Sequence, residues 1–133
     1  MSQENLEPRA IAEAALGAVN SGDLDALVAM VTEDVEFTSL VAEVEGTTFR
    51  GHEGVCVWWE TVRGAFEGVT WELLDFRGGA ERGVLRFRMA GMLSGVPVEQ
   101  TMWQAVKARD GKLSWWATFR TEREALEAVG LRG

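Results

Sequence analysis

Residues Gly95 to Arg120 read GVPVEQTMWQAVKARDGKLSWWATFR, and this stretch decides the fold. Two apolar, aromatic-rich runs flank Asp110-Gly111, a pair that tolerates the positive φ angles of a tight hairpin turn. Trp115 and Trp116 are consecutive, so on a strand their side chains point to opposite faces. Since both faces of this strand carry large apolar groups, neither face is expected to lie simply in water. We therefore expect one face to pack on helices or line a cavity and the other to meet a partner.

The composition is typical of one globular domain. The chain has 133 residues, 47% hydrophobic and 26% charged, which is enough apolar material to bury a core, and a single domain is expected over residues 1–133. The net charge of −8 disfavours nucleic acid and anionic membrane as partners, because both need a basic patch. The N-terminal segment is polar and acidic, unlike a signal peptide, and no apolar run reaches the roughly 18 residues of a membrane helix. A cytoplasmic location is therefore expected.

The first half of the chain has mostly helical periodicity. Apolar residues recur at helical spacing from Ile11 to Val19, and Asn20-Ser21-Gly22-Asp23 has the residue types that end one helix and cap the next. A second short helix is predicted over residues 24–31. Alternation from Val35 to Ser39 then predicts a half-buried strand. A short extended piece near Thr47–Arg50 and a third helix from His52 to about Phe66 follow.

The second half has the alternation of an antiparallel meander. Gly78-Gly79 and Ser94-Gly95 are turn signals between its apolar runs. Helices that come first and antiparallel strands that come last predict an α+β domain. The predicted strands cover residues 69–76, 85–89, 99–107 and 112–120, and a last helix covers residues 122–129.

Five stretches occur in an order typical of one superfamily. They are Asn20–Leu27, Glu33–Phe37, Phe49–Val55, Arg109–Leu113 and Glu124–Leu131. In this order and spacing they resemble the SnoaL-like, polyketide cyclase-like branch of the nuclear transport factor 2-like superfamily, which includes ketosteroid isomerase. The resemblance covers nearly the whole chain. It implies a cone-shaped α+β fold, in which a bent mixed sheet wraps around the N-terminal helices and a third helix and encloses one deep pocket.

The resemblance also implies which side chains face this pocket and which face a second subunit. Members commonly dimerise through the outer face of the sheet, so Trp115 and Phe119 are predicted to contact a second copy in a homodimer. Indole rings with a few polar groups make a good site for a small hydrophobic molecule, and the third helix would present Trp58 or Trp59 to it. An arginine there would pair with an acid or an anionic ligand, or would reach water at the strand end. The predicted ligand-binding set consists of Thr38, Trp58, Trp103, Trp116, Thr118 and Arg120.

No catalytic residue can be assigned by the resemblance. When the chain is aligned by the end of its first helix and by the Asp-Gly turn, the tyrosine of ketosteroid isomerase falls near Leu16. The two acids of that enzyme fall near Phe37 or Thr38 and near Trp103. None of the three groups is present, so steroid isomerisation by that machinery is not expected.

Other residues would have to supply acid–base chemistry. Glu36, Asp75 and His52 are the ionisable candidates for a cofactor-free cyclase, isomerase or dehydratase reaction. The single histidine and the single cysteine, Cys56, do not supply the ligands of a zinc site, and no glycine-rich loop leads from a strand into a helix. Neither a metal nor a cofactor is therefore expected. The alternative is a non-catalytic, dimeric binding or interaction module, and the sequence leaves open whether the chain is an enzyme.

Overall fold

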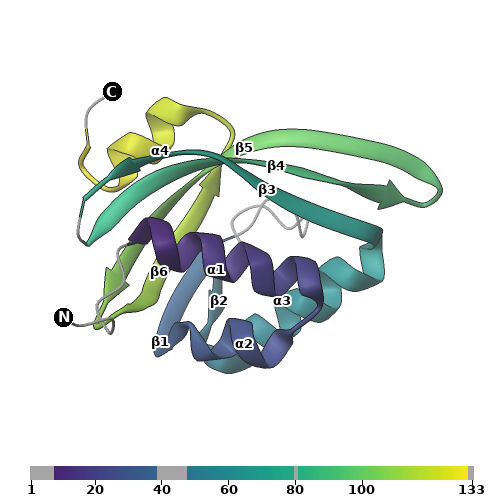
Figure 1. Cartoon of the computed structure of the whole chain (residues 1–133), viewed down its shortest axis with the longest axis horizontal. Helices are drawn as coiled ribbons and strands as arrows, with labels where there is room; N and C mark the ends of the chain where they lie inside the picture. Colours follow the sequence, from purple (N-terminus) through teal and green to yellow (C-terminus); the bar gives the residue numbers. More distant parts are fainter. Residues whose placement is uncertain (1–7, 39–47, 80, 132–133) are drawn as a thin grey trace.

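The structure, a computed structural model, describes residues 8–38, 48–79 and 81–131. In these ranges a six-stranded sheet carries three helices on one face and a fourth helix on the other (Figure 1). The α+β prediction is therefore confirmed. None of these helices has the length and hydropathy of a membrane-spanning segment. The elements are α1 (Pro8–Ser21), α2 (Leu24–Ala29), β1 (Val31–Thr38), β2 (Thr48–Arg50), α3 (Gly51–Ala65), β3 (Phe66–Gly78), β4 (Arg82–Leu93), β5 (Val96–Arg109), β6 (Lys112–Phe119) and α4 (Glu122–Ala128).

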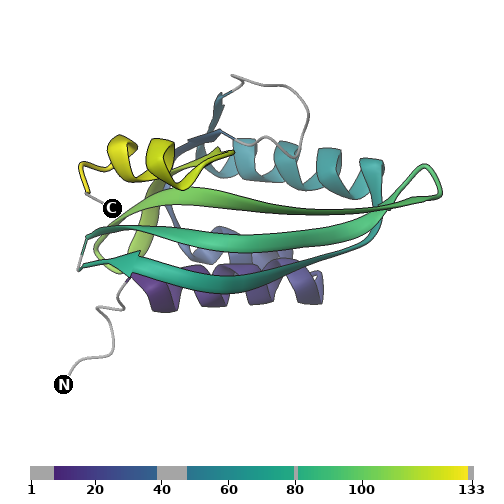
Figure 2. The ribbon, with the colours of Figure 1, turned by 90° about the horizontal axis from the view of Figure 1, so that it is seen from above.

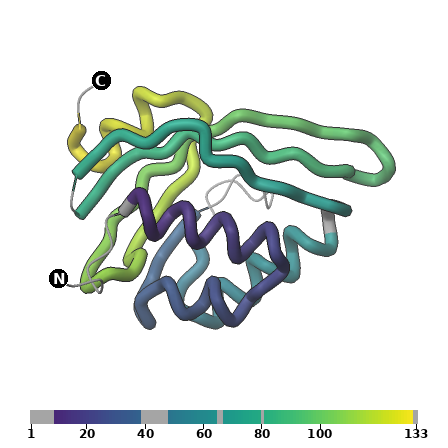
Figure 3. Tube along the Cα trace, in the orientation of Figure 1, coloured from purple at the N-terminus to yellow at the C-terminus, as the bar shows by residue number. Residues whose placement is uncertain are grey.

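The sheet is mixed and strongly bent. Its strand order is β2-β1-β6-β5-β4-β3, in which β1 and β6 run parallel and every other neighbouring pair is antiparallel. In Figure 3 the long strands β3, β4 and β5 pass above α1, while β1 and β6 descend beside it. Seen from above, α1 and α3 run roughly along the long strands (Figure 2). The sheet therefore curves around the helices, as the predicted cone requires.

Two hairpins with two-residue turns set the register at the centre of the sheet. Asp110 and Gly111 have φ angles of 56° and 77°, and Ser94 and Gly95 have φ angles of 50° and 81°. Positive φ at both central residues gives a turn whose twist matches that of the flanking strands. Strand β5 begins at Val96, earlier than predicted, because its pairing with β4 continues up to the second turn.

Strand β6 buries both of its faces within the chain. Trp116 lies in a core between the inner face of the sheet and helices α1–α3, together with Phe37 and Val106. Trp115 packs on a second cluster, which includes Leu126 of α4, on the outer face. The prediction that one face packs on helices is confirmed, and the opposite face packs against α4 of the same chain.

Asn20 fixes the end of α1 to strand β3. Its side-chain nitrogen donates to the backbone carbonyl of Trp71 at 2.8 Å, and its side-chain oxygen accepts from the backbone N–H of Trp71 at 2.7 Å. β3 is an edge of the sheet, so these backbone groups have no neighbouring strand on that side. The Asn20 amide takes the place of such a strand and holds the Trp71 backbone against α1.

Strand pairing shortens the predicted second helix. The periodicity predicts a helix as far as Val31, but α2 ends at Ala29 and Val31 pairs with Leu113 of β6. The pairing begins with a hydrogen bond from the Leu113 N–H to the carbonyl of Met30 at 2.9 Å. A contact with a distant strand therefore outweighs the local helical preference at this point. The predicted strand boundaries at Ser39 and Thr47 lie outside the described residues.

Two helical glycines provide a test of the packing. A Cβ added to Gly17 on α1 meets no atom within 4 Å. Gly17→Ala should therefore raise the free energy of unfolding by about 1 kcal/mol through helix propensity.

A Cβ added to Gly54 on α3 comes within 3.0 Å of the Phe49 carbonyl carbon. In Gly54→Ala the overpacking against this backbone atom should outweigh the gain in helix propensity, and the free energy of unfolding should fall by about 1 kcal/mol. Urea unfolding measures both changes, and a stabilised Gly54→Ala protein would contradict the close contact between α3 and β2.

Candidate functional site

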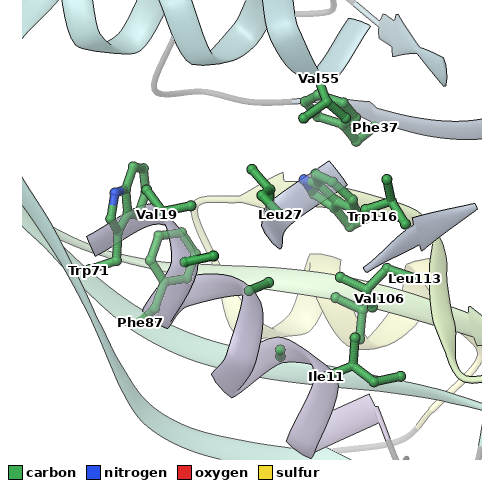
Figure 4. Close-up of a cluster of buried hydrophobic side chains, with 14 of the residues drawn as sticks. Ile11, Val19, Leu27, Phe37, Val55, Trp71, Phe87, Val106, Leu113 and Trp116 are labelled. Carbon is green, nitrogen blue, oxygen red and sulfur yellow. The ribbon is translucent and has the colours of Figure 1, made fainter. Parts of the chain in front are cut away.

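A cavity of about 50 Å³ lies between the inner face of the sheet and helices α1, α2 and α3. Figure 4 shows part of its wall, with Trp71 and Phe87 on one side and Trp116 and Leu113 on the other. Within the described part of the chain, Gln104 is the only lining residue that is neither aliphatic nor aromatic, and no lining residue is ionisable. The lining consists of Ala12, Ala15, Leu16, Val19, Leu27, Trp58, Trp71, Phe87, Gln104, Leu113 and Trp116.

Aromatic rings form a continuous chain beside this cavity. Phe37 of β1 stacks on Trp116 of β6 with ring centroids 4.3 Å apart, and on Phe49 of β2 at 5.1 Å. Trp58 of α3 meets Phe37 edge-on at 6.2 Å and lies 6.1 Å from Trp71 of β3. Aromatic pairs at these distances attract one another beyond the effect of area burial. Ring contacts therefore join four strands and α3 around the cavity.

The polar groups at this otherwise apolar site are the Gln104 amide and the indole N–H groups of Trp58, Trp71 and Trp116. Gln104 is on the inner face of β5, where its neighbours across the sheet are Leu85 on β4 and Thr118 on β6. The indole nitrogen of Trp71 is fully covered and has no hydrogen-bond partner among the described residues. An unpaired buried donor costs about 1–3 kcal/mol of stability. The Gln104 amide, in contrast to the Trp71 nitrogen, is on a half-buried side chain and can be reached.

Sequence reasoning missed Gln104 and the contribution of α1. The signal for Gln104 is present in the strand, because this amide interrupts an apolar alternation between Met102 and Val106. The signal for α1 is its face of small residues, in which Ala12 and Ala15 leave room beneath the sheet. Neither signal identifies a cavity until the position of the sheet above the helix is known.

The structure brings together only part of the predicted ligand-binding set. Trp58 and Trp116 line the cavity, and Thr118 is buried next to Gln104 without being part of the lining. Thr38 ends β1, and Arg120 is exposed just after β6. Neither Thr38 nor Arg120 lies at the cavity.

The prediction that Trp103 faces inward is wrong. Trp103 packs on the cluster beneath α4, and its cross-strand partner on β6 is Phe119. Residues directly opposite each other in an antiparallel pair have their side chains on the same face. An outward-facing Phe119 therefore requires an outward-facing Trp103. The predicted register is off by one residue along this strand, which is enough to reverse the face of a side chain.

The candidate acids and bases lie away from the cavity. Glu36 is exposed and accepts a hydrogen bond from Arg50 at 3.2 Å. Asp75 is exposed on β3, and the Nε2 atom of His52 lies 3.3 Å from the carbonyl oxygen of Val31. No three His, Cys, Asp or Glu side chains in the described ranges are grouped as a metal ion would need. The lining can supply van der Waals contacts and hydrogen bonds to a bound molecule, but no ionisable group.

An open polar groove lies where β1 meets the β5–β6 turn. It contains charges of both signs, and Arg109 donates a hydrogen bond to Asp34 across 2.7 Å. The Arg109 guanidinium holds the pKa of Asp34 below its ordinary value of 3.8. This ion pair ties β1 to the turn. The groove is lined by Thr32, Glu33, Asp34, Arg109, Asp110 and Lys112.

Comparison with known proteins agrees with this arrangement. The family model described as a SnoaL-like domain matches residues 12–116. A search of curated proteins gives no match. Among solved structures, a hypothetical protein from Catenulispora acidiphila with a ketosteroid isomerase-like fold, in complex with trimethylamine, is 17% identical over 96% of each chain, with a TM-score of 0.75.

Two putative polyketide cyclases of known structure are also similar. The protein from Sinorhizobium meliloti is 21% identical over 82% of this chain and 93% of its own, with a TM-score of 0.69. The protein from Xanthomonas campestris is 17% identical over 91% of this chain and 95% of its own, with a TM-score of 0.70. Identities at this level show that the fold is shared, and they do not transfer an activity.

Removing Arg109 should change the titration of Asp34. Because the folded-state pKa of Asp34 is lowered, the ion pair stabilises the fold above the ordinary carboxyl pKa, and this contribution is lost as the pH falls. In Arg109→Gln the pKa of Asp34 should rise toward 3.8, which the pH dependence of its carboxyl ¹³C chemical shift measures. Arg9→Gln, on α1, is the control and should leave that titration unchanged. An unshifted midpoint in Arg109→Gln would contradict the pair.

Proposed function

The chain belongs to the SnoaL-like domain family, and we propose that it binds a compact apolar molecule in the cavity beneath its sheet and that the side chains lining this cavity do not act as acids or bases. The observation that carries this proposal is the lining itself. Among the described residues, three tryptophans, a phenylalanine and aliphatic side chains surround the space, with one amide and no ionisable group. Burial of apolar ligand surface is favourable by about 25 cal/mol per Å². A charged ligand would lose its hydration there without gaining a counter-charge.

The volume of the cavity limits the size of the ligand. Benzene binds in an engineered protein cavity of about 150 Å³. A space of about 50 Å³ therefore holds only a smaller molecule unless its wall moves. Leu16 is a half-buried aliphatic member of the lining, so a larger ligand would displace its side chain.

A cyclase, isomerase or dehydratase reaction has less support. General acid–base catalysis needs an ionisable group within about 3 Å of the proton that is transferred, or one water away. Glu36, Asp75 and His52 are all outside the lining. The similarity to putative polyketide cyclases concerns the fold, and the activity of such a fold depends on the side chains placed in its site.

We also propose that the chain forms a homodimer through the outer face of the sheet, as the family resemblance implies. Trp115 and Phe119 are half-buried beside α4 on this face. Further along the same face, Arg88 forms ion pairs with Glu72 and Glu99. Half-buried aromatic rings next to charges of both signs are what a second copy, related by a twofold axis, would complement.

Filling the cavity should abolish ligand binding. The side chain of Ala15→Leu occupies part of the space, whereas the same change at Ala14 on the exposed face of α1 leaves the cavity unchanged. We expect 2-methylpropene to shift the indole N–H NMR signals of Trp58, Trp71 and Trp116 in the wild-type and Ala14→Leu proteins. These signals should not shift in Ala15→Leu. If neither 2-methylpropene nor acetone shifts these signals in the wild-type protein, the cavity is not a ligand site.

A positive charge on the outer face should disrupt the dimer. Thr101 is exposed and lies directly opposite Arg88, so Thr101→Arg places two like charges side by side in the proposed interface. We expect size-exclusion chromatography with light scattering to give the mass of a dimer for the wild type and of a monomer for Thr101→Arg. Thr61→Arg, on the exposed side of α3, is the matched control and should stay dimeric. A monomeric wild type or a dimeric Thr101→Arg protein would contradict the interface.

A further inference from the structure

We propose that Gln104 determines which molecule the cavity accepts, and that the ligand is a compact neutral molecule with one hydrogen-bonding oxygen, in a carbonyl or a hydroxyl group. This inference rests on the proposed function of the cavity as a ligand site. It adds a chemical class for the ligand and one specificity-determining residue.

Gln104 occupies a position that is unusual for a polar side chain. Its amide stands on the inner face of β5 between Met102 and Val106, which are both buried in the core. The residue opposite it on β4 is the buried Leu85, and the one opposite on β6 is Thr118. An inner-face position among such neighbours would ordinarily be apolar, because an amide removed from water needs hydrogen-bond partners. The Gln104 amide is therefore a polar group at a position where the neighbouring side chains on β5 and β4 are apolar.

No other side chain of the described lining can both donate and accept a hydrogen bond. Gln104 is the only amide among the described lining residues, and no lining residue there carries a charge. The indole nitrogens of the three lining tryptophans only donate, and the Trp71 nitrogen is fully covered by its neighbours. A polar atom of a ligand would therefore meet Gln104 rather than Trp71.

The chemistry of the amide defines the class of ligand. Its NH₂ group donates and its oxygen accepts, so it pairs with a carbonyl oxygen or with a hydroxyl group. A purely apolar ligand would cover the amide and leave it unpaired, and an ion would be desolvated without a counter-charge. Sites that pair with a ligand's polar group discriminate strongly against analogues that lack it. The combination of apolar walls and one amide therefore selects a neutral molecule with a single polar oxygen.

The test compares probes of similar size: acetone, 2-propanol and 2-methylpropene. Their dissociation constants are measured by NMR titration of the indole N–H signals in the wild type and in Gln104→Met, which removes the amide and nearly keeps the volume. We expect the affinity for acetone or for 2-propanol, relative to 2-methylpropene, to fall about tenfold in Gln104→Met, because the oxygen loses its partner. A fall for acetone alone identifies a carbonyl ligand, and a fall for 2-propanol alone identifies a hydroxyl ligand.

Gln100→Met is the matched control. Gln100 lies on the same strand and the same face but is exposed and outside the lining, so its replacement should leave both relative affinities unchanged. Unchanged relative affinities in Gln104→Met, with 2-methylpropene still bound, would overturn the role of Gln104 and leave the proposed function standing. If no probe binds to the wild-type protein, both proposals fail together. Gln104→Leu is measured in the same way and decides the question if Gln104→Met does not fold.

Discussion

The stacking of Phe37 between Phe49 and Trp116 is the interaction on which the rest of the structure depends. Phe37 is only 1% exposed, and it lies on β1, the strand that joins the short edge strand β2 to β6. The parallel pairing of β1 with β6 connects segments far apart in the sequence, so it must be supported by packing as well as by backbone hydrogen bonds. Trp58 meets the same ring edge-on and brings α3 to it. One side chain thus links the closure of the sheet, the position of α3 and one wall of the cavity.

The cavity follows from a mismatch in size between α1 and the rings around it. Ala12 and Ala15 are small where α1 lines the space, whereas β3 and β6 supply the indoles of Trp71 and Trp116. Rings that are already stacked, and a Trp71 backbone that is held by Asn20, cannot move far into the space. Interiors relax only in part around missing volume, and a void therefore persists.

Local properties of the chain could be predicted, and properties that depend on a distant partner could not. Consecutive Trp115 and Trp116 predict a strand with two buried faces, because successive side chains of any strand point to opposite faces. Asp110-Gly111 predicts the hairpin because of its φ angles. The face of the sheet on which Trp103 lies could not be predicted in this way, because it depends on which residue of β6 stands opposite. The cavity is harder still to predict, because it is a small space left between residues that lie on several elements.

The energetics of so small a cavity also limit how a ligand can bind. Filling about 50 Å³ is worth about 1 kcal/mol at roughly 24 cal/mol per Å³, and a hydrogen bond to Gln104 adds about 1 kcal/mol. A millimolar dissociation constant already requires about 4 kcal/mol, so a ligand confined to the cavity as it stands binds weakly. Tight binding needs more buried apolar area, and displacement of the half-buried Leu16 side chain would provide it. A tightly bound ligand would therefore have its polar oxygen at Gln104 and an apolar part extending past Leu16.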